Sequence, residues 1–470
     1  ALGVREQFGR VTGETRLSRD PGYARGMRAD MPGRVVLDGL PICREALRLP
    51  DYRLDTVARE VLGRGKLITG TGRDKAEEIQ RQYREEPEAL VAYNLEDARL
   101  VTEILEHEGL LDLCIERSLL TGMPLDRVSA SIASFDQLYL PELNRRGRVA
   151  PSVDATRKAA GLGGGAVLDS VPGLSNNVAL FDFKSLYPSL IRTFHLDPLA
   201  FALGRDEKNA VSAPNGARFS RTDAILPELI EHMMTRREAA KSRGDRHADQ
   251  AIKIMMNSLY GVLGASACRF FEPEIANAIT GFGQQTLRWT RDAFQEAGTR
   301  VIYGDTDSVF VDLVGQSADA LRKKVEAEIC ARVHDDYGVE PKLVLELERV
   351  FDRFFLPRVR GGKSGSKKRY AGWTEGKLHI AGLEAVRRDW PELGKRLQRG
   401  LLERLFRDEP LLPFAEQIVA DLRSGSVDRE LVYVKRLRKG EGEYTKTTPP
   451  HVQAARKAGR TGGVIRYVIT

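Results

Sequence analysis

The segment that most constrains the fold is 301–311, Val-Ile-Tyr-Gly-Asp-Thr-Asp-Ser-Val-Phe-Val. Two apolar arms rich in β-branched and aromatic residues flank Asp305 and Asp307, a pattern that predicts two strands joined by a turn that carries the acids. Carboxylates are costly to bury unless a cation neutralises them, and Mg²⁺ takes oxygen ligands. The segment therefore predicts a β-hairpin with a metal site at its tip. The alternative is a hairpin whose Gly and Asp residues only make the turn.

A second acidic residue occupies a similar setting. Residues 178–187 run from an apolar strand through Asp182 towards Pro188 and a predicted helix. If the two strands lie side by side, Asp182 joins Asp305 and Asp307 in a carboxylate cluster able to hold two metal ions. Such sites clamp the attacking and leaving oxygens of a phosphoryl displacement. The sequence thus predicts phosphoryl-transfer chemistry.

Cations are concentrated on a predicted helical hairpin, residues 227–261, in which a polar turn joins two helices. Arg237 and Lys241 are four residues apart, and so are Lys253 and Asn257, so each pair lies on one helix face. Two antiparallel helices could direct the three cations into one cleft that neutralises a triphosphate. The alternative is that they are ordinary surface charges.

Two further segments are strongly basic. Residues 358–369 carry six positive side chains and no acid, and residues 435–439 carry four. These side chains are Arg358, Arg360, Lys363, Lys367, Lys368 and Arg369, and Lys435, Arg436, Arg438 and Lys439. Such runs form solvated surface or contact phosphates along a nucleic-acid duplex. The whole chain, with 73 basic and 66 acidic residues and a net charge of +7, agrees weakly with a polyanionic partner.

Length and composition set the remaining bounds. A chain of 470 residues is too long for one compact core, so two to four domains are expected. Its 42% hydrophobic and 30% charged residues are ordinary for a globular protein. No run of about 18 apolar residues predicts a membrane span. Four scattered cysteines without a CxxC pair predict no zinc site and a reducing, cytoplasmic location.

Other elements follow from periodicity and turn residues. A short strand is predicted at 34–39, and a Gly-rich stretch at 161–165 predicts a hinge between domains. Helices are predicted at 54–62, 86–110, 125–146 and 267–300 and from 391 onward, and a strand at 343–349.

Three segments together resemble the polymerase signatures of the family B DNA polymerases. They are DFKSLYPSLI (182–191), KIMMNSLYG (253–261) and YGDTDS (303–308), in the family's order. Four more resemble the bacterial DNA polymerase II branch of the family: ACRFF (267–271), GSKKRYAG (365–372), GLEAVRRDW (382–390) and PPHV (449–452). The resemblance covers nearly the whole chain and implies a DNA-templated DNA polymerase.

The implied fold is an α+β multidomain protein shaped as a right-hand polymerase, preceded by the C-terminal part of an RNase H-like exonuclease domain. The implied divisions are a partial 3′–5′ exonuclease at 1–125, palm at 126–225 and 266–390, helical-hairpin fingers at 226–265 and a partial thumb at 391–470. Both ends of the chain are expected to be truncated.

The resemblance implies roles for the acidic residues. Asp182 and Asp307 are expected to bind two Mg²⁺ ions, for which Mn²⁺ can substitute, with the backbone carbonyl of Phe183 as a further ligand. Asp305 is expected to support them. The implied reaction is two-metal transfer of a nucleotide from a dNTP to a primer 3′-hydroxyl.

It also implies the residues that bind substrates. The triphosphate would meet Arg237, Lys241, Lys253 and the amides of Ser185 and Leu186, at the start of a helix. Tyr187 would lie under the sugar and exclude a 2′-hydroxyl, although it could instead be an aromatic core residue. Asn257, Tyr260 and Gly261 would line the base-pair pocket, and Lys367, Lys368, Arg369 and Tyr370 would contact the primer–template duplex. The Gly-rich stretch lacks the aromatic residue with which the family's template-handling loop usually begins.

The exonuclease part departs from the family pattern. Tyr93 and Asp97 resemble its third signature, in which the Asp holds a metal ion and the Tyr orients water. We find neither of the two earlier acidic signatures before residue 93, and Asp38 has a different neighbourhood. The expectation is a chain without exonuclease activity.

Three alternatives are weighed against a family B polymerase. Reverse transcriptases carry adjacent acids instead of Asp-Thr-Asp, and protein-primed enzymes need an insertion for which the interval from Asp182 to Lys253 leaves little room. A catalytically silent DNA-binding or scaffolding relative would usually have lost the acids. The expected partners are primer–template DNA, dNTPs and, for the full-length protein, a sliding clamp, with no membrane. The expected location is the bacterial cytoplasm, in association with the nucleoid.

Overall fold

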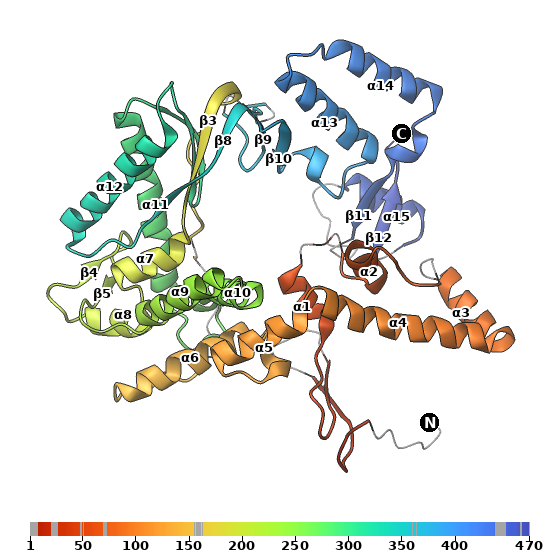
Figure 1. Ribbon diagram of the computed structural model, residues 1–470, viewed down its shortest axis with the longest axis horizontal. Coiled ribbons are helices and arrows are strands. Elements are labelled where there is room, and N and C mark those ends of the chain that lie inside the picture. The colour runs from red at the N-terminus through yellow and green to blue at the C-terminus, as the bar shows by residue number, and fades with distance from the viewer. Residues whose placement is uncertain are drawn as a thin grey trace. The chain divides into compact units, whose positions relative to one another are not determined.

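The computed structural model (Figure 1) describes residues 8–469 except 20–26, 48, 50, 69–72, 155, 157–160, 162, 360, 363, 438–447 and 461–462. Of the basic residues named above, Arg360, Lys363, Arg438 and Lys439 lie outside the described residues. The chain divides into two compact units, residues 1–163 with 190–279 and residues 164–189 with 280–470. The first boundary falls within the Gly-rich stretch at 161–165. The five-part division stays a prediction.

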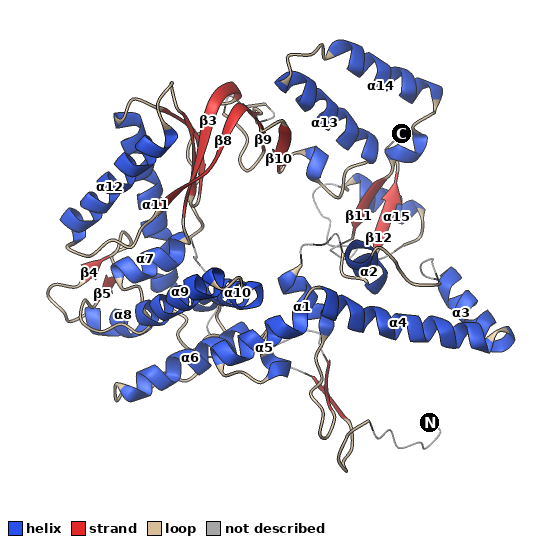
Figure 2. Cartoon of the chain, in the orientation of Figure 1, coloured by secondary structure: helices blue, strands red, loops and turns tan. Residues whose placement is uncertain are grey.

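The second unit is built on a six-stranded antiparallel sheet (Figure 2). The strand order is β10 (Lys377–Ala381), β9 (Tyr370–Thr374), β8 (Leu345–Leu356), β3 (Gly173–Phe183), β7 (Ser308–Asp312) and β6 (Arg300–Asp305). β6 and β7 are the predicted hairpin, and β3 is the predicted strand that contains Asp182. Because β3 lies between β7 and β8, the two predicted acidic segments are neighbours in the sheet.

The two faces of the sheet differ in what covers them. Phe181 of β3 packs against Phe294 of α11 (Pro273–Glu296), with the rings tilted and their centroids 4.7 Å apart, and α12 (Ala318–Tyr337) packs along β8. Val178 and Leu180 belong to the opposite face, where they join the aromatic residues Tyr303, Phe310, Phe351 and Phe354. Since side chains alternate along a strand, Asp182 belongs to this aromatic face, away from α11.

The rest of the second unit is mainly helical, as predicted from residue 391. It contains η2 (Glu384–Val386), α13 (Glu392–Phe406), α14 (Leu412–Ser424), η3 (Asp428–Leu431), β11 (Tyr433–Arg436), α15 (Pro450–Lys457) and β12 (Val464–Tyr467). Leu393, Ile418 and Val427 form a small core between these helices. No described helix is both long and apolar enough to cross a bilayer.

The first unit is largely helical. It contains β1 (Arg16–Arg19), β2 (Met27–Asp30), α1 (Gly39–Ala46), α2 (Leu54–Leu62), α3 (Arg73–Glu85), α4 (Pro87–His107), α5 (Leu110–Thr121), η1 (Leu125–Arg127), α6 (Ser131–Arg145), α8 (Pro198–Gly204), β4 (Val211–Ser212), β5 (Arg218–Phe219), α9 (Leu226–Ser242) and α10 (Arg246–Leu263). The predicted helices at 54–62, 86–110 and 125–146 are confirmed. One more helix, α7 (Leu186–Phe194), begins in the second unit and ends in the first.

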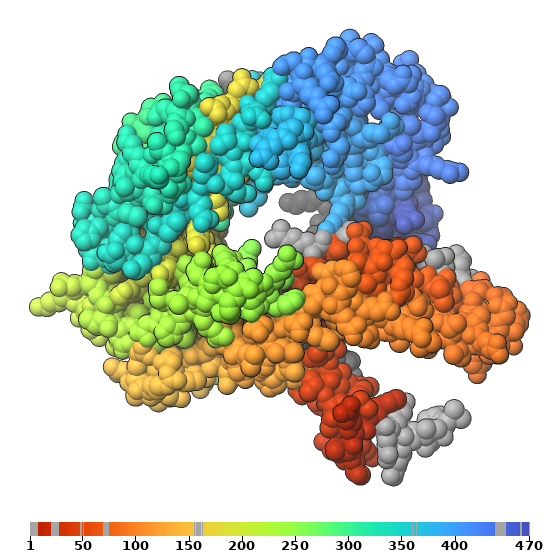
Figure 3. Space-filling view, viewed as in Figure 1, coloured from red at the N-terminus to blue at the C-terminus, as the bar shows by residue number. Residues whose placement is uncertain are grey.

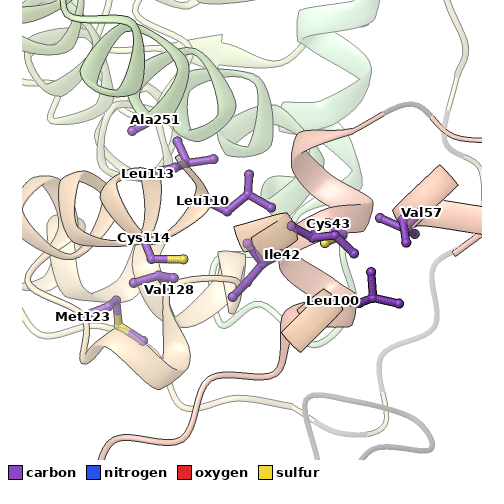
Figure 4. Close-up of a cluster of buried hydrophobic side chains, with 12 residues drawn as sticks. Ile42, Cys43, Val57, Leu100, Leu110, Leu113, Cys114, Met123, Val128 and Ala251 are labelled. Carbon is purple, nitrogen blue, oxygen red and sulfur yellow. The ribbon is translucent and has the colours of Figure 1, made fainter. Parts of the chain in front are cut away.

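Helix α10 is anchored in the core of the first unit. Ala251 packs with Leu110 and Leu113 of α5, in a cluster that also contains Ile42 and Leu100 (Figure 4). Helices α9 and α10 pack against each other, which confirms the predicted helical hairpin. Both helices reach the surface of their unit, where they are green in the space-filling view (Figure 3).

The predicted strand at 34–39 is wrong. Residues 35–38 form no regular element, and α1 begins at Gly39. The side chain of Asp38 accepts a hydrogen bond from the amide of Leu40, 3.0 Å away, and so caps α1. A three-residue apolar run gives no strand here because the acid that follows it starts a helix.

Candidate active site

Of the two acids expected to bind metal, Asp182 lies near the end of β3 and Asp307 lies in the turn just before β7, the neighbouring strand. Asp182 of β3 is opposite Ser308 of β7, and the amide of Phe183 donates a 3.0 Å hydrogen bond to the carbonyl of Asp307. This backbone contact holds Asp307 beside the end of β3. Asp182 and Asp307 are therefore neighbours, whereas their joint role as metal ligands stays a prediction.

The surroundings of Asp182 and Asp307 raise the pKa of both carboxyl groups and so disfavour their charged forms. Burial raises the pKa of Asp182 to about 7, and the charges of Asp307, Glu348 and Glu346 add to this effect. Burial also raises the pKa of Asp307, with a further contribution from the charge of Asp305. A hard cation would relieve this repulsion, and carboxylate oxygens are the ligands it prefers. The residues thus fit a divalent metal site.

Glu346 and Glu348 are members of the cluster that the sequence argument missed. Both lie on β8, and Glu346 is directly opposite Asp182. Their signal is the alternation Leu345-Glu346-Leu347-Glu348 within a strand that is otherwise largely apolar. Among the described residues, however, no three His, Cys, Asp or Glu side chains are already arranged as a metal centre.

Asp305 is held by the protein itself. Its carboxylate accepts hydrogen bonds from the hydroxyls of Tyr303 at 3.2 Å and Thr306 at 3.1 Å. The ammonium of Lys368 is 3.4 Å from the same carboxylate, and the Lys368 amide donates to the Tyr303 hydroxyl at 2.7 Å. Asp305 therefore links the β6–β7 hairpin to Lys368 of the basic segment 358–369.

A loop packs over the hairpin and explains Gly304. The amide of Leu168 donates to the Gly304 carbonyl at 3.0 Å, and the amide of Thr306 donates to the Ala166 carbonyl at 2.9 Å. A Cβ added at Gly304 would be 2.6 Å from the Leu168 side chain, closer than real Cβ contacts come. A side chain at position 304 would therefore have to displace the Leu168 side chain from the hairpin.

The strand β3 leads through a tight turn into α7. Ser185 in this turn has a φ of +51°, in the left-handed region, and α7 begins at Leu186. Within the described part of the chain, the amides of Ser185 and Leu186 have no hydrogen-bond acceptor. Such a helix start is suited to an anion. Tyr187 is partly buried.

On α10, the residues predicted to meet the nucleotide share one face. Lys253, Asn257 and Gly261 follow one another at four-residue spacing, and all three are exposed, whereas Tyr260 is half-buried. On α9, Lys241 is exposed and lies 3.8 Å from Glu238. Arg237 differs, because its Nε donates a 2.7 Å hydrogen bond to Asp249.

Asp197 fixes the start of α9 and was not anticipated from the sequence. It is fully buried and accepts hydrogen bonds from the Tyr139 hydroxyl at 2.9 Å and the amides of Leu226 and Leu199, each at 2.8 Å. Burial raises the pKa of Asp197. One carboxylate thus joins α6, α8 and α9, which positions the helix that carries Arg237.

The four residues expected to contact a duplex have different surroundings. Lys367 and Lys368 are exposed. Arg369 forms an ion pair with Glu384, and Tyr370 packs edge-on against Phe310 with ring centroids 4.8 Å apart. Lys367 is therefore available to a polyanion, and Lys368 is exposed but also faces Asp305, while the other two residues hold the segment on the sheet.

Tyr93 and Asp97 lie one turn apart on α4, as predicted. The ammonium of Lys66 is 2.5 Å from the Asp97 carboxylate and 5.4 Å from the centre of the Tyr93 ring. Burial alone lowers the pKa of Lys66, but hydrogen bonds to Asp97 and Tyr93 outweigh burial and raise it, so the ammonium stays charged. A lysine thus occupies the position beside Asp97 where the resemblance implied a metal ion.

Replacing Lys66 by Met should lower the free energy of unfolding by about 2 kcal/mol, because the largely buried Asp97 carboxylate would lose its counter-ion. Chemical denaturation of the parent and the variant measures this change. The double variant Lys66→Met/Asp97→Asn is the control and should recover most of the loss. An unchanged denaturation midpoint for Lys66→Met would show that the pair is not stabilising.

A family model for DNA polymerase family B matches residues 128–469. DNA polymerase II of Escherichia coli (strain K12) is 39% identical over 480 aligned positions, which cover 96% of this chain and 61% of that protein. A DNA polymerase of Thermococcus sp. (strain 9oN-7) is 28% identical, with 100% and 62% covered, and one of Archaeoglobus fulgidus is 29% identical, with 93% and 55% covered. The chain spans about three fifths of the length of these relatives.

Proposed function

Because this chain belongs to DNA polymerase family B, we propose that it copies a DNA template by adding dNTPs to a primer 3′-hydroxyl. One observation carries the proposal most directly. Asp182 of β3 and Asp307, just before the neighbouring strand β7, lie close together, and the pKa of each of these two carboxyls is raised. A cluster of this kind is costly to keep unless it serves a cation.

Two Mg²⁺ ions, or Mn²⁺ in their place, would be held by Asp182, Asp307 and the carbonyl of Phe183. When bound, they would supply charge stabilisation to the attacking and leaving oxygens. The protein contributes the geometry. The sheet pairing of β3 and β7 sets the spacing of the two acids, and Asp305 holds the hairpin to Lys368. Glu346 and Glu348 add negative charge that strengthens attraction for the cations.

The nucleotide would be bound by cations and by backbone amides. Lys253, Lys241 and Arg237 of the helical hairpin would neutralise the triphosphate, and the amides of Ser185 and Leu186 would donate to its oxygens. Tyr187 would exclude ribonucleotides by contact with the 2′-position. Asn257 and Tyr260 would border the new base pair, where Gly261 offers room, because an added Cβ there would meet no protein atom within 4 Å.

Primer–template DNA would be held mainly through its phosphates. Lys367 and Lys368 are exposed cations of the basic segment 358–369, and Arg369 and Tyr370 would keep that segment in place. A groove of about 440 Å³ beside α13 is lined by Lys395, Arg399 and Arg404, among others, and would give the duplex a second basic surface. A sliding clamp would act on the full-length protein.

In this proposal, residues 126–225 and 266–390 form the palm, 226–265 the fingers and 391–470 a partial thumb. Residues 1–125 would be an exonuclease remnant, inactive because Asp97 is paired with Lys66. The protein would work in the bacterial cytoplasm.

Primer extension tests the proposal. A labelled primer on a longer template, with dNTPs and Mg²⁺, should lengthen one nucleotide at a time in the order that the template specifies. An unextended primer with both Mg²⁺ and Mn²⁺ would refute it.

Binding of Mg²⁺ should release protons near neutral pH. With a pKa of about 7, Asp182 is mostly protonated at pH 6.5 in the metal-free chain, and the ion must displace that proton. We expect release of about one proton per chain at pH 6.5 and almost none at pH 8.5, so apparent affinity should rise with pH until about pH 7 and then level off. Calorimetry in two buffers of different ionisation enthalpy measures this release, and Asp182→Asn is the control that should abolish it. Equal proton release at both pH values would contradict the prediction.

A further inference from the structure

The helical hairpin contains an acid among its proposed phosphate-binding cations. Nε of Arg237, on α9, donates to Oδ1 of Asp249, on α10, at a distance of 2.7 Å. The two side chains are only 14% and 31% exposed, so water screens the pair incompletely. Of the three proposed cations, Arg237 is therefore the one whose charge an acid from the opposite helix already satisfies.

The position of Asp249 places it in the row that would face the nucleotide. It precedes Lys253 by four residues and Asn257 by eight, so the three side chains lie along one face of α10. The helix does not need Asp249 as its cap, because Asp245 is the N-cap and accepts from the Ala248 amide at 3.0 Å. The other two cations differ from Arg237, since Lys253 is exposed and Lys241 lies no closer than 3.8 Å to its exposed neighbour Glu238.

We propose that Asp249 sets the affinity for the nucleotide by competing with the triphosphate for Arg237. The inference rests on the proposed function, which assigns Arg237 to the triphosphate. A carboxylate carries one negative charge, whereas a triphosphate carries several charges and can be held by Lys253 and Lys241 at the same time. The triphosphate therefore displaces Asp249 from Arg237, at the cost of the ion pair. A nucleoside monophosphate does not displace it.

The competition also gives selectivity by charge. When no triphosphate is bound, Arg237 is occupied, so a ligand with a single phosphate meets only the two lysines. When a triphosphate is bound, the displaced carboxylate stays on the same helix face and favours release of the ligand. Asp249 thus weakens binding of every nucleoside triphosphate. It also hinders anions of lower charge from reaching Arg237.

The test is the variant Asp249→Asn, which keeps the size of the side chain and removes its charge. Calorimetric titration of the full chain with dATP and Mg²⁺ gives the Kd without need for catalysis. We expect the Kd for dATP to fall about threefold to tenfold, the range expected for loss of a partly exposed ion pair, and the Kd for dAMP to fall as well, because Arg237 is then open to a single phosphate. Asp249→Glu, which keeps the charge, should bind dATP like the parent.

The Arg237→Gln background distinguishes loss of the Arg237–Asp249 ion pair from the general effect of removing a negative charge. In chains that also carry Arg237→Gln, the change Asp249→Asn should no longer alter the Kd for dATP. A Kd that is unchanged or raised in Asp249→Asn would overturn the proposal, and so would an equal fall in the Arg237→Gln background.

The same titrations separate this inference from the proposed function. Tighter dATP binding by Asp249→Asn, in a chain that does not extend primers, would support the competition and refute the polymerase. Primer extension by the parent chain, together with an equal Kd for dATP in the parent and in Asp249→Asn, would support the polymerase and refute the competition. If neither the parent nor Asp249→Asn binds dATP, both proposals fail.

Discussion

Replacement of Asp307 by Asn should lower the rate of primer extension by at least about 10³-fold, since an amide cannot replace the carboxylate as a ligand for two divalent ions. The same change should leave the chain folded and slightly more stable. Burial raises the pKa of Asp307, and it faces the charge of Asp305, so removal of its own charge relieves repulsion. Activity and stability should therefore move in opposite directions, which a misfolded variant would not show.

The measurements are single-nucleotide incorporation for activity and thermal unfolding without metal for stability. Asp312→Asn is the matched control, because Asp312 lies at the other end of β7 and pairs with Arg300 at 2.9 Å. This control should keep its activity. Retention of more than about a tenth of the parent rate by Asp307→Asn would exclude Asp307 as a metal ligand.

Replacement of Lys253 by Ala should lower kcat/KM for a dNTP about 10²-fold, the loss typical when one donor to a developing charge is removed. Lys253 is exposed on the face of α10 that also carries Asn257, and no ion pair occupies it within the described residues. Its charge is therefore available to the triphosphate. The Kd for primer–template DNA should change little, because the proposed contact is with the nucleotide.

Arg236→Ala provides the matched control for charge. Arg236 is an exposed cation on α9, next to Arg237 but about 100° further round the helix. It should keep kcat/KM within about threefold of the parent value. A Lys253→Ala variant that loses DNA affinity and keeps its nucleotide kinetics would assign this lysine to the duplex instead.

The main catalytic candidates could be predicted because their signal is local. Asp305 and Asp307 interrupt an apolar hairpin, and Asp182 ends an apolar strand, so both patterns are visible within about ten residues. The pairing of β3 with β7 then brings them together, which the family resemblance implied. Lys253 and Asn257 could be placed on one helix face from their spacing alone.

The residues that escaped prediction depend on contacts between distant segments. Glu346 joins the cluster only through the register of β8 on β3, which shifts near Leu180. The pairs Arg237–Asp249 and Lys66–Asp97 require two helices, or a helix and a loop, to pack in one particular way. The predicted strand at 34–39 failed for the opposite reason, since the local capping acid Asp38 overrode a short apolar run.

The close packing of Leu168 on Gly304 affects how mutational data for this chain should be interpreted. Any larger residue at 304 would push Leu168 away and loosen the loop from the hairpin. A library selected only for DNA synthesis would then rank Gly304 with the proposed metal-binding acids, although it has no functional group to offer. Measurement of soluble, folded protein alongside enzyme output would distinguish this steric requirement from a chemical one.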